Sequence, residues 1–88
     1  MKIKKFYYTD TFKKKLNKLS SKNKVKIEKR LELFLENPFN PILKTHKLTG
    51  KLKQFCSFSI DYHNRIMFKF EKENVVDFID IGTHGIYK

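Results

Sequence analysis

The sequence contains little cysteine and little glycine, and it has no long apolar run. Its one cysteine, Cys56, excludes an internal disulfide and a Cys-x-x-Cys metal set, so a reducing cytosol is the expected compartment. Three glycines are too few for a glycine-rich phosphate loop. No stretch approaches the roughly 18 apolar residues of a membrane span, and the first residues lack the apolar region of a signal peptide. We therefore expect a cytoplasmic protein that has no membrane partner.

Acidic residues are also scarce. The chain has 20 Lys and Arg against nine Asp and Glu, which gives a formal net charge of +11, and most of the excess lies in residues 1–30. Such a surface attracts polyanions, with nucleic acid first and anionic lipid or an acidic protein after it. A solubilising coat of lysine is the alternative interpretation. Because only two of the basic residues are Arg, each Arg is more informative than any one Lys.

The apolar pattern predicts one domain, residues 1–88, because so short a chain cannot divide its core. Residues 2–8 predict a strand, and Thr9 and Asp10 are good helix N-caps. Apolar residues at helical spacing predict helices over 11–19 and 22–36, joined at Ser20 and Ser21 and ended by prolines. The buried faces are expected to carry Phe12, Leu16, Leu19, Ile27, Leu31 and Phe34, widened by Val25, Leu33 and Leu35.

The second half of the chain alternates in the manner of strands. Residues 54–60 and 65–70 predict a hairpin around the polar turn 61–64, and the apolar run 75–82 predicts a central strand. Residues 42–53 predict a loop or an irregular strand. The predicted fold is therefore α+β, in the order βααβββ, with an αα-hairpin packed on one face of an antiparallel sheet.

Candidate functional residues lie on the sheet face away from the helices and in the tail. Alternation assigns Arg65, Met67, Lys69, Ser57 and Ser59 to that face. Arg65 is either an ion-pair partner of Asp61 or Asp80, or a phosphate clamp, because a guanidinium binds phosphate bidentately. His84 directly follows the last strand, and imidazole is the side chain that titrates nearest neutrality. An exposed, inert histidine is the alternative.

Other reactive residues give weaker signals. His46 is a further candidate, whereas His63 lies in a turn and is expected to be structural or exposed. Three histidines without regular spacing do not predict a zinc site, and Cys56 falls on an apolar strand face, where an inert thiol is expected. The stretch 42–53 is basic without a single acid, through Lys44, His46, Lys47, Lys51 and Lys53.

Taken in order, these features resemble the RelE/ParE superfamily of type II toxin–antitoxin toxins, specifically its messenger-RNA interferases. The resemblance rests on the Thr-Phe-Lys-Lys-Lys-Leu helix, on residues 46–53 and 61–68, and on Ile81-Gly82-Thr83-His84 with Tyr87. It implies a ribosome-dependent endoribonuclease that cuts mRNA in the decoding site. It also implies a cognate antitoxin, which we expect to be acidic because this chain is basic.

The resemblance implies a role for each matching residue. His84 resembles the C-terminal histidine that acts as acid or base in YafQ-like and YoeB-like toxins, and Arg65 resembles the strand arginine that binds the scissile phosphate. His46 matches the histidine before the Leu-x-Gly motif, and Tyr87 matches an aromatic position that can stack on a base. Ser59 stands where YafQ-like toxins have a second internal histidine, so the general base is left open.

The implied chemistry needs neither a metal nor another cofactor. A base takes the proton of a ribose 2′-OH, that oxygen attacks the adjacent phosphate, and an acid protonates the departing 5′-oxygen. We expect Arg65 and Lys53 to bind the phosphate, His84 to serve as acid or base, and His46 to be the possible second proton carrier. The residues expected to bind RNA are Lys44, Lys47 and Lys51, by charge, and Tyr87, by stacking.

Two other functions fit the sequence less well. A ParE-like inhibitor of DNA gyrase has the same fold, but it has little use for a tail histidine paired with a basic loop. A non-catalytic nucleic-acid-binding module would bind in a salt-dependent way without breaking strands.

Overall fold

The computed structural model describes residues 1–87, apart from the side chains of His84 and Tyr87. Its strands are β1 (Lys5–Tyr8), β2 (His46–Lys47), β3 (Cys56–Ser59), β4 (Arg65–Phe70) and β5 (Val75–Gly82). Its helices are α1 (Asp10–Asn17) and α2 (Ser21–Glu36), with single turns of 3-10 helix at η1 (Pro41–Leu43), η2 (Gly50–Leu52) and η3 (His84–Tyr87). The α+β class and the predicted order of the main elements are confirmed, and β2 is an additional short strand.

The five strands form one sheet in the order β1-β5-β4-β3-β2. The strands from β2 to β5 pair antiparallel, as expected, but β1 pairs with β5 in parallel. The sheet is therefore mixed, which corrects the prediction of an antiparallel sheet. The alternation of apolar residues identifies each strand but does not say which edge of the meander the first strand joins.

Both helices of the hairpin begin at predicted caps. The hydroxyl of Thr9 accepts a hydrogen bond from the backbone N–H of Phe12 at 3.1 Å and donates one to the carbonyl of Ile79 at 2.7 Å. The hydroxyl of Ser20 accepts one from the backbone N–H of Asn23 at 3.3 Å. The bonds from Phe12 and Asn23 satisfy backbone donors that a helix start leaves without partners. The bond from Thr9 to Ile79 ties the start of α1 to β5.

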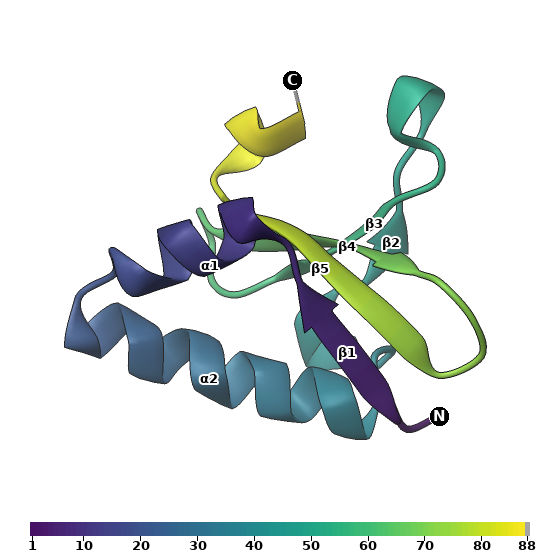
Figure 1. Cartoon of the computed structure of the whole chain (residues 1–88), viewed down its shortest axis with the longest axis horizontal. Coiled ribbons are helices and arrows are strands. Elements are labelled where there is room, and N and C mark those ends of the chain that lie inside the picture. The colour runs from purple at the N-terminus through teal and green to yellow at the C-terminus, as the bar shows by residue number, and fades with distance from the viewer. Residues whose placement is uncertain (88) are drawn as a thin grey trace.

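The core lies between the two helices and the sheet (Figure 1). Its largest fully buried side chains are Phe12, Phe34, Phe58, Phe68 and Phe78. Phe34 of α2 stacks on Phe58 of β3 with ring centroids 4.5 Å apart. The prediction for Val25 and Leu33 was wrong, since they are 50% and 37% exposed. The buried stripe of α2 is therefore narrower than its sequence suggests.

The opposite face of the sheet is partly enclosed. Met67 and Ser57 lie on it and are only 6% and 1% exposed. In Figure 1 the turn η3 and the loop that carries η2 project on the side away from α2. The tail and the β2–β3 loop therefore lie on the side of the sheet where the candidate functional residues are predicted. None of the helices within residues 1–87 is long and apolar enough to cross a membrane.

Candidate functional site

Arg65 lies in a row of residues that crosses one end of the sheet. It pairs with Ser59 of β3 on one side and with Gly82 of β5 on the other. Directly paired residues share a sheet face, so Arg65 is on the predicted face with Ser59. The turn η3 begins at His84, two residues after Gly82. The backbone of the tail therefore starts beside Arg65, whereas the side chains of His84 and Tyr87 lie outside the described residues.

Both carboxylates considered as partners of Arg65 bind lysines. Asp80 accepts a hydrogen bond from Nζ of Lys15 at 2.6 Å and another from the backbone N–H of Ile81 at 2.8 Å. Asp61 accepts one from Nζ of Lys26 at 3.0 Å. These contacts hold α1 and α2 against the end of the sheet that carries Arg65.

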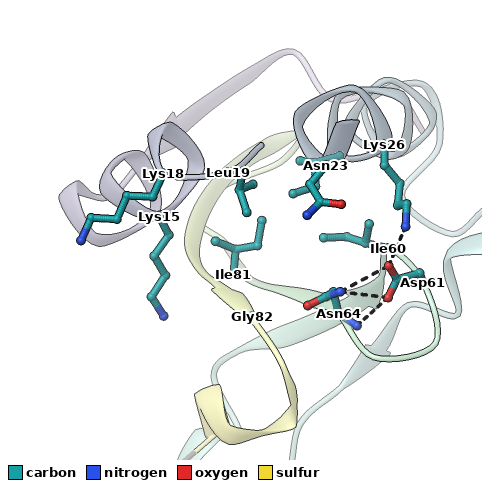
Figure 2. Close-up of a pocket in the computed structure, with 11 residues that line it drawn as sticks. Lys15, Lys18, Leu19, Asn23, Lys26, Ile60, Asp61, Asn64, Ile81 and Gly82 are labelled. Atoms are coloured by element: carbon teal, nitrogen blue, oxygen red, sulfur yellow. Dashed lines mark hydrogen bonds and ion pairs between the residues drawn. The ribbon is translucent and has the colours of Figure 1, made fainter. Parts of the chain in front are cut away.

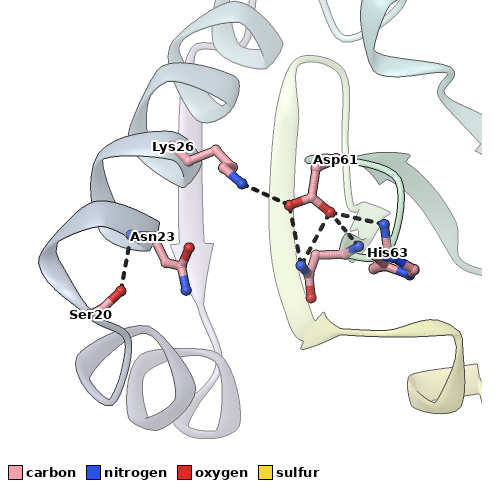
Figure 3. Close-up of polar contacts among 6 residues, drawn as sticks. Ser20, Asn23, Lys26, Asp61 and His63 are labelled. Carbon is pink, nitrogen blue, oxygen red and sulfur yellow. Dashed lines mark hydrogen bonds and ion pairs between the residues drawn. The ribbon is translucent and has the colours of Figure 1, made fainter.

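Asp61 also organises the turn between β3 and β4 (Figure 3). Its Oδ1 accepts hydrogen bonds from the backbone N–H groups of His63 at 3.0 Å and Asn64 at 2.8 Å. These bonds, that from Asn64 above all, hold the pKa of Asp61 well below its usual range, and Lys26 lowers it further. The carboxylate thus stays ionised and fixes the turn that precedes Arg65. His63 is exposed in this turn, as expected.

A first basic cavity, of about 510 Å³, lies along β2 and contains three of the predicted residues, His46, Lys47 and Lys53. Nδ1 of His46 is 3.0 Å from the carbonyl oxygen of Lys44. Because a carbonyl oxygen only accepts, Nδ1 carries the hydrogen, and the Nε2 of a neutral ring can accept a proton. In a neutral His46 ring held by this contact, Nε2 is therefore the hydrogen-bond acceptor.

Cys56 borders the same cavity and is half-buried. Burial raises the pKa of its thiol, and the nearby Lys47 lowers it to a smaller extent. A thiol held in its protonated form is a poor nucleophile, so the residue fits the inert role that its strand position indicates. Within the described part of the chain, no three His, Cys, Asp or Glu side chains come together as a metal site.

A second basic cavity, of about 360 Å³, lies at the end of β3 that β2 does not cover. It is lined by Arg30, Ile42, Lys44, Ser59, Ile60, Asp61, Tyr62 and Arg65. Two predicted residues, Lys44 and Arg65, meet here. Arg30 and Tyr62 also line this cavity and are not among the residues predicted from the sequence. The signal that marks Arg30 is its rarity, since it is one of only two arginines in the chain.

A third cleft, of about 260 Å³, opens between the helical hairpin and the sheet. Figure 2 shows Lys15, Lys18 and Lys26 around it, with Leu19, Ile60 and Ile81 along its wall. An apolar cleft with a cationic rim suits a partner that presents apolar and acidic side chains together.

Comparison with known proteins gives matches to solved structures alone: no family model matches the chain, and no curated protein sequence is similar to it. A YoeB/ParE toxin from Agrobacterium tumefaciens is 17% identical with a TM-score of 0.76, covering 91% of this chain and 98% of the toxin. The E. coli DinJ–YafQ toxin–antitoxin complex contains a chain 21% identical with a TM-score of 0.70, and 92% of each chain is covered. A chain of the archaeal RelE–RelB complex from Pyrococcus horikoshii is 13% identical with a TM-score of 0.74, covering 97% of this chain and 98% of that one. The chain has the RelE/ParE toxin fold.

On this RelE/ParE fold the predicted site residues fall into two groups. His46, Lys47 and Lys53 share the first basic cavity, and Lys44 and Arg65 share the second. On ideal sheet spacings, the pairing register separates the Cα atoms of His46 and Arg65 by roughly 12 Å on one face. The two residues are therefore not neighbours in the sheet, and they line separate cavities. Lys51 is exposed in η2 and does not line either of these two cavities.

Proposed function

We propose that the chain is the toxin of a type II toxin–antitoxin system and that it stops translation by cleaving mRNA on the ribosome. The pairing of Arg65 with Gly82 carries this proposal, because it sets the sheet arginine beside the backbone that leads to His84. The fold shared with the YoeB/ParE toxin and with the RelE–RelB and DinJ–YafQ complexes supports it. The net charge of +11 suits a polyanionic target.

The reaction is an internal transesterification of RNA. A base takes the proton of the ribose 2′-OH, the 2′-oxygen forms a bond to phosphorus, and the bond from phosphorus to the 5′-oxygen breaks. An acid protonates that leaving oxygen, so the products are a 2′,3′-cyclic phosphate and a 5′-hydroxyl. Proton transfer by positioned side chains contributes about 10²- to 10⁴-fold to such a rate.

Two histidines divide the proton transfers. His46 is the base, because the contact between its Nδ1 and the carbonyl of Lys44 leaves Nε2 as the acceptor. His84 is then the acid that protonates the leaving oxygen. Arg65 and Lys53 stabilise the charge that develops on the phosphate, a contribution of about 3 kcal/mol for a well-placed donor. Tyr87 stacks on a base, and Lys44, Lys47 and Lys51 bind RNA by charge.

The partner that silences this activity is an acidic antitoxin. We assign its docking site to the cleft of Figure 2, where the exposed Lys18 adds positive charge beside Lys15 and Lys26, which are ion-paired with Asp80 and Asp61. Lys18, the C-cap residue of α1, is exposed at the rim of this cleft, whereas Lys14 is exposed within α1 and does not line the cleft. Lys18→Glu should weaken toxin–antitoxin binding in calorimetry, whereas Lys14→Glu should not. Equal affinities for the two variants would contradict this docking site.

Induction in cells tests the proposed function. Arg65→Ala should abolish growth arrest and mRNA decay, since it removes the phosphate ligand from the sheet. Lys69→Ala is the matched control, because it removes a cation from the same strand while keeping Arg65. Growth arrest by the Arg65→Ala protein with intact mRNA would contradict the proposal. Inhibition of DNA gyrase by the purified protein would then favour the ParE-like activity.

A further inference from the structure

The two arginines of the chain line the same cavity. Arg30 comes from α2 and Arg65 from β4, and they meet at the uncovered end of β3 in the second basic cavity, of about 360 Å³. All the other basic residues, apart from histidine, are lysines, 18 in number. Since guanidinium binds phosphate bidentately and lysine does not, the shared position of both arginines points to a phosphate-bearing ligand.

The backbone around the cavity is held in a defined shape. Arg30 donates a hydrogen bond from Nη1 to the carbonyl of Ile42 at 3.1 Å, which joins α2 to the turn η1. Lys44 follows that turn with a φ of 52°, in the left-handed region that residues with a side chain rarely adopt. Lys44, the third cation of the cavity, therefore has an unusual backbone conformation.

The charge of the cavity is positive. Arg30, Lys44 and Arg65 line it together with one carboxylate, that of Asp61. The oxygens of Asp61 accept hydrogen bonds from the ammonium of Lys26 and from the backbone of the turn, which offsets its negative charge. An anion in the cavity would thus meet three cations and a carboxylate that is already neutralised by a neighbour.

Flat apolar surface adjoins these cations. Tyr62 is 89% exposed and Ile42 is 56% exposed, and both line the cavity. A phenol ring this exposed is a platform on which a nucleobase can stack, and stacking is the usual way in which proteins hold single-stranded bases. Cations next to an exposed ring favour a nucleotide over a simple anion or an acidic peptide.

We propose that this cavity is a subsite for one nucleotide of single-stranded RNA, with its phosphate on Arg30, Lys44 and Arg65 and its base on Tyr62. The inference rests on the proposed function, because Arg65 is also the ligand of the scissile phosphate. The subsite therefore receives the nucleotide next to the cleaved bond. Arg30 and Tyr62 extend the site beyond the residues that carry the chemistry.

Binding of an uncleavable oligonucleotide tests the subsite separately from cleavage. The probe is a fluorescein-labelled single-stranded oligodeoxynucleotide, which lacks the attacking 2′-OH, and the readout is fluorescence anisotropy as a function of salt. Tyr62→Leu should raise the Kd at least fivefold, because the loss of stacking on an aromatic side chain weakens binding by about that factor or more. Tyr62→Phe keeps the ring and should leave the Kd within about twofold of the wild-type value. Polyglutamate serves as the competitor that represents an acidic peptide.

The salt dependence separates a phosphate contact from general charge. Arg30→Gln should reduce the slope of log K against log salt by about 0.7, the value for one phosphate contact on a single strand. Lys29→Gln removes the same charge from an exposed neighbour on α2 and should leave the slope unchanged. Wild-type values for both Arg30→Gln and Tyr62→Leu would overturn the subsite while leaving the cleavage proposal intact. Displacement of the probe by polyglutamate at equal charge would overturn it in favour of an acidic peptide.

Discussion

Replacing Asp61 by alanine should loosen the turn between β3 and β4, which sets the positions of Tyr62 and Arg65. The carboxylate accepts hydrogen bonds from two backbone N–H groups at 3.0 and 2.8 Å and from Lys26 at 3.0 Å. A hydrogen bond to a charged group contributes about 1.5 kcal/mol or more, and water partly replaces these bonds in an open turn. We therefore expect a loss of about 2 kcal/mol, equivalent to roughly 10 °C in Tm for a domain of this size.

The dependence on pH identifies the charge as the cause. Because folding lowers the pKa of Asp61, its stabilisation is fully present above the unfolded pKa of about 4 and is lost as the pH falls through the lower folded pKa. Asp61→Asn keeps an oxygen acceptor but no charge. Its stability deficit against the wild-type protein should be constant from pH 7 to 5 and should shrink below about pH 4.

Urea unfolding followed by circular dichroism measures both effects. Glu32→Gln is the control, because it removes an exposed carboxylate on α2 and should change stability by less than about 0.5 kcal/mol. A deficit for Asp61→Asn that is the same at pH 7 and pH 3 would refute the electrostatic explanation. Wild-type stability of Asp61→Ala at pH 7 would refute the claim that the Asp61 carboxylate stabilises the turn.

Two further pairs of variants test the tail and the base. A Cβ at Gly82 would lie 2.8 Å from Cγ2 of Ile86, so Gly82→Ala should displace η3 and reduce mRNA cleavage at least tenfold, whereas Gly85→Ala, whose nearest contact is 3.7 Å, should retain cleavage. Equal activity of the two glycine variants would show that the tail position does not matter. His46→Ala should slow cleavage by about 10²-fold or more as a lost general base, while His63→Ala should not, and a purified-component cleavage assay distinguishes them.

The sequence predicts the elements of this fold better than their assembly. Thr9 and Ser20 signal the helix starts because a hydroxyl directly before a helical pattern can accept a hydrogen bond from a backbone N–H group of the first turn. The alternation from Arg65 to Phe70 identifies a strand and its two faces. The parallel pairing of β1 with β5 has no local signal, since it joins residues about 70 positions apart.

Some residues of the candidate site can be recognised in the sequence, and others only in the folded chain. Arg65 is visible in the sequence because it begins an apolar strand, and His46 is visible in its basic stretch. Arg30 is marked in the sequence only as one of two arginines, and only the folded chain shows that it lines the same cavity as Arg65. Tyr62 gives no signal, because an aromatic residue in a turn is as compatible with packing as with exposure.

Mapping of the 5′ ends of cellular mRNA after induction tests the central proposal most directly. The wild-type chain should produce new 5′-hydroxyl ends within translated regions, and these ends should be absent with a His84→Ala variant expressed at the same level. The same ends produced by the His84→Ala variant, or growth arrest by the wild-type chain without any new ends, would contradict the account of this protein as an mRNA endoribonuclease.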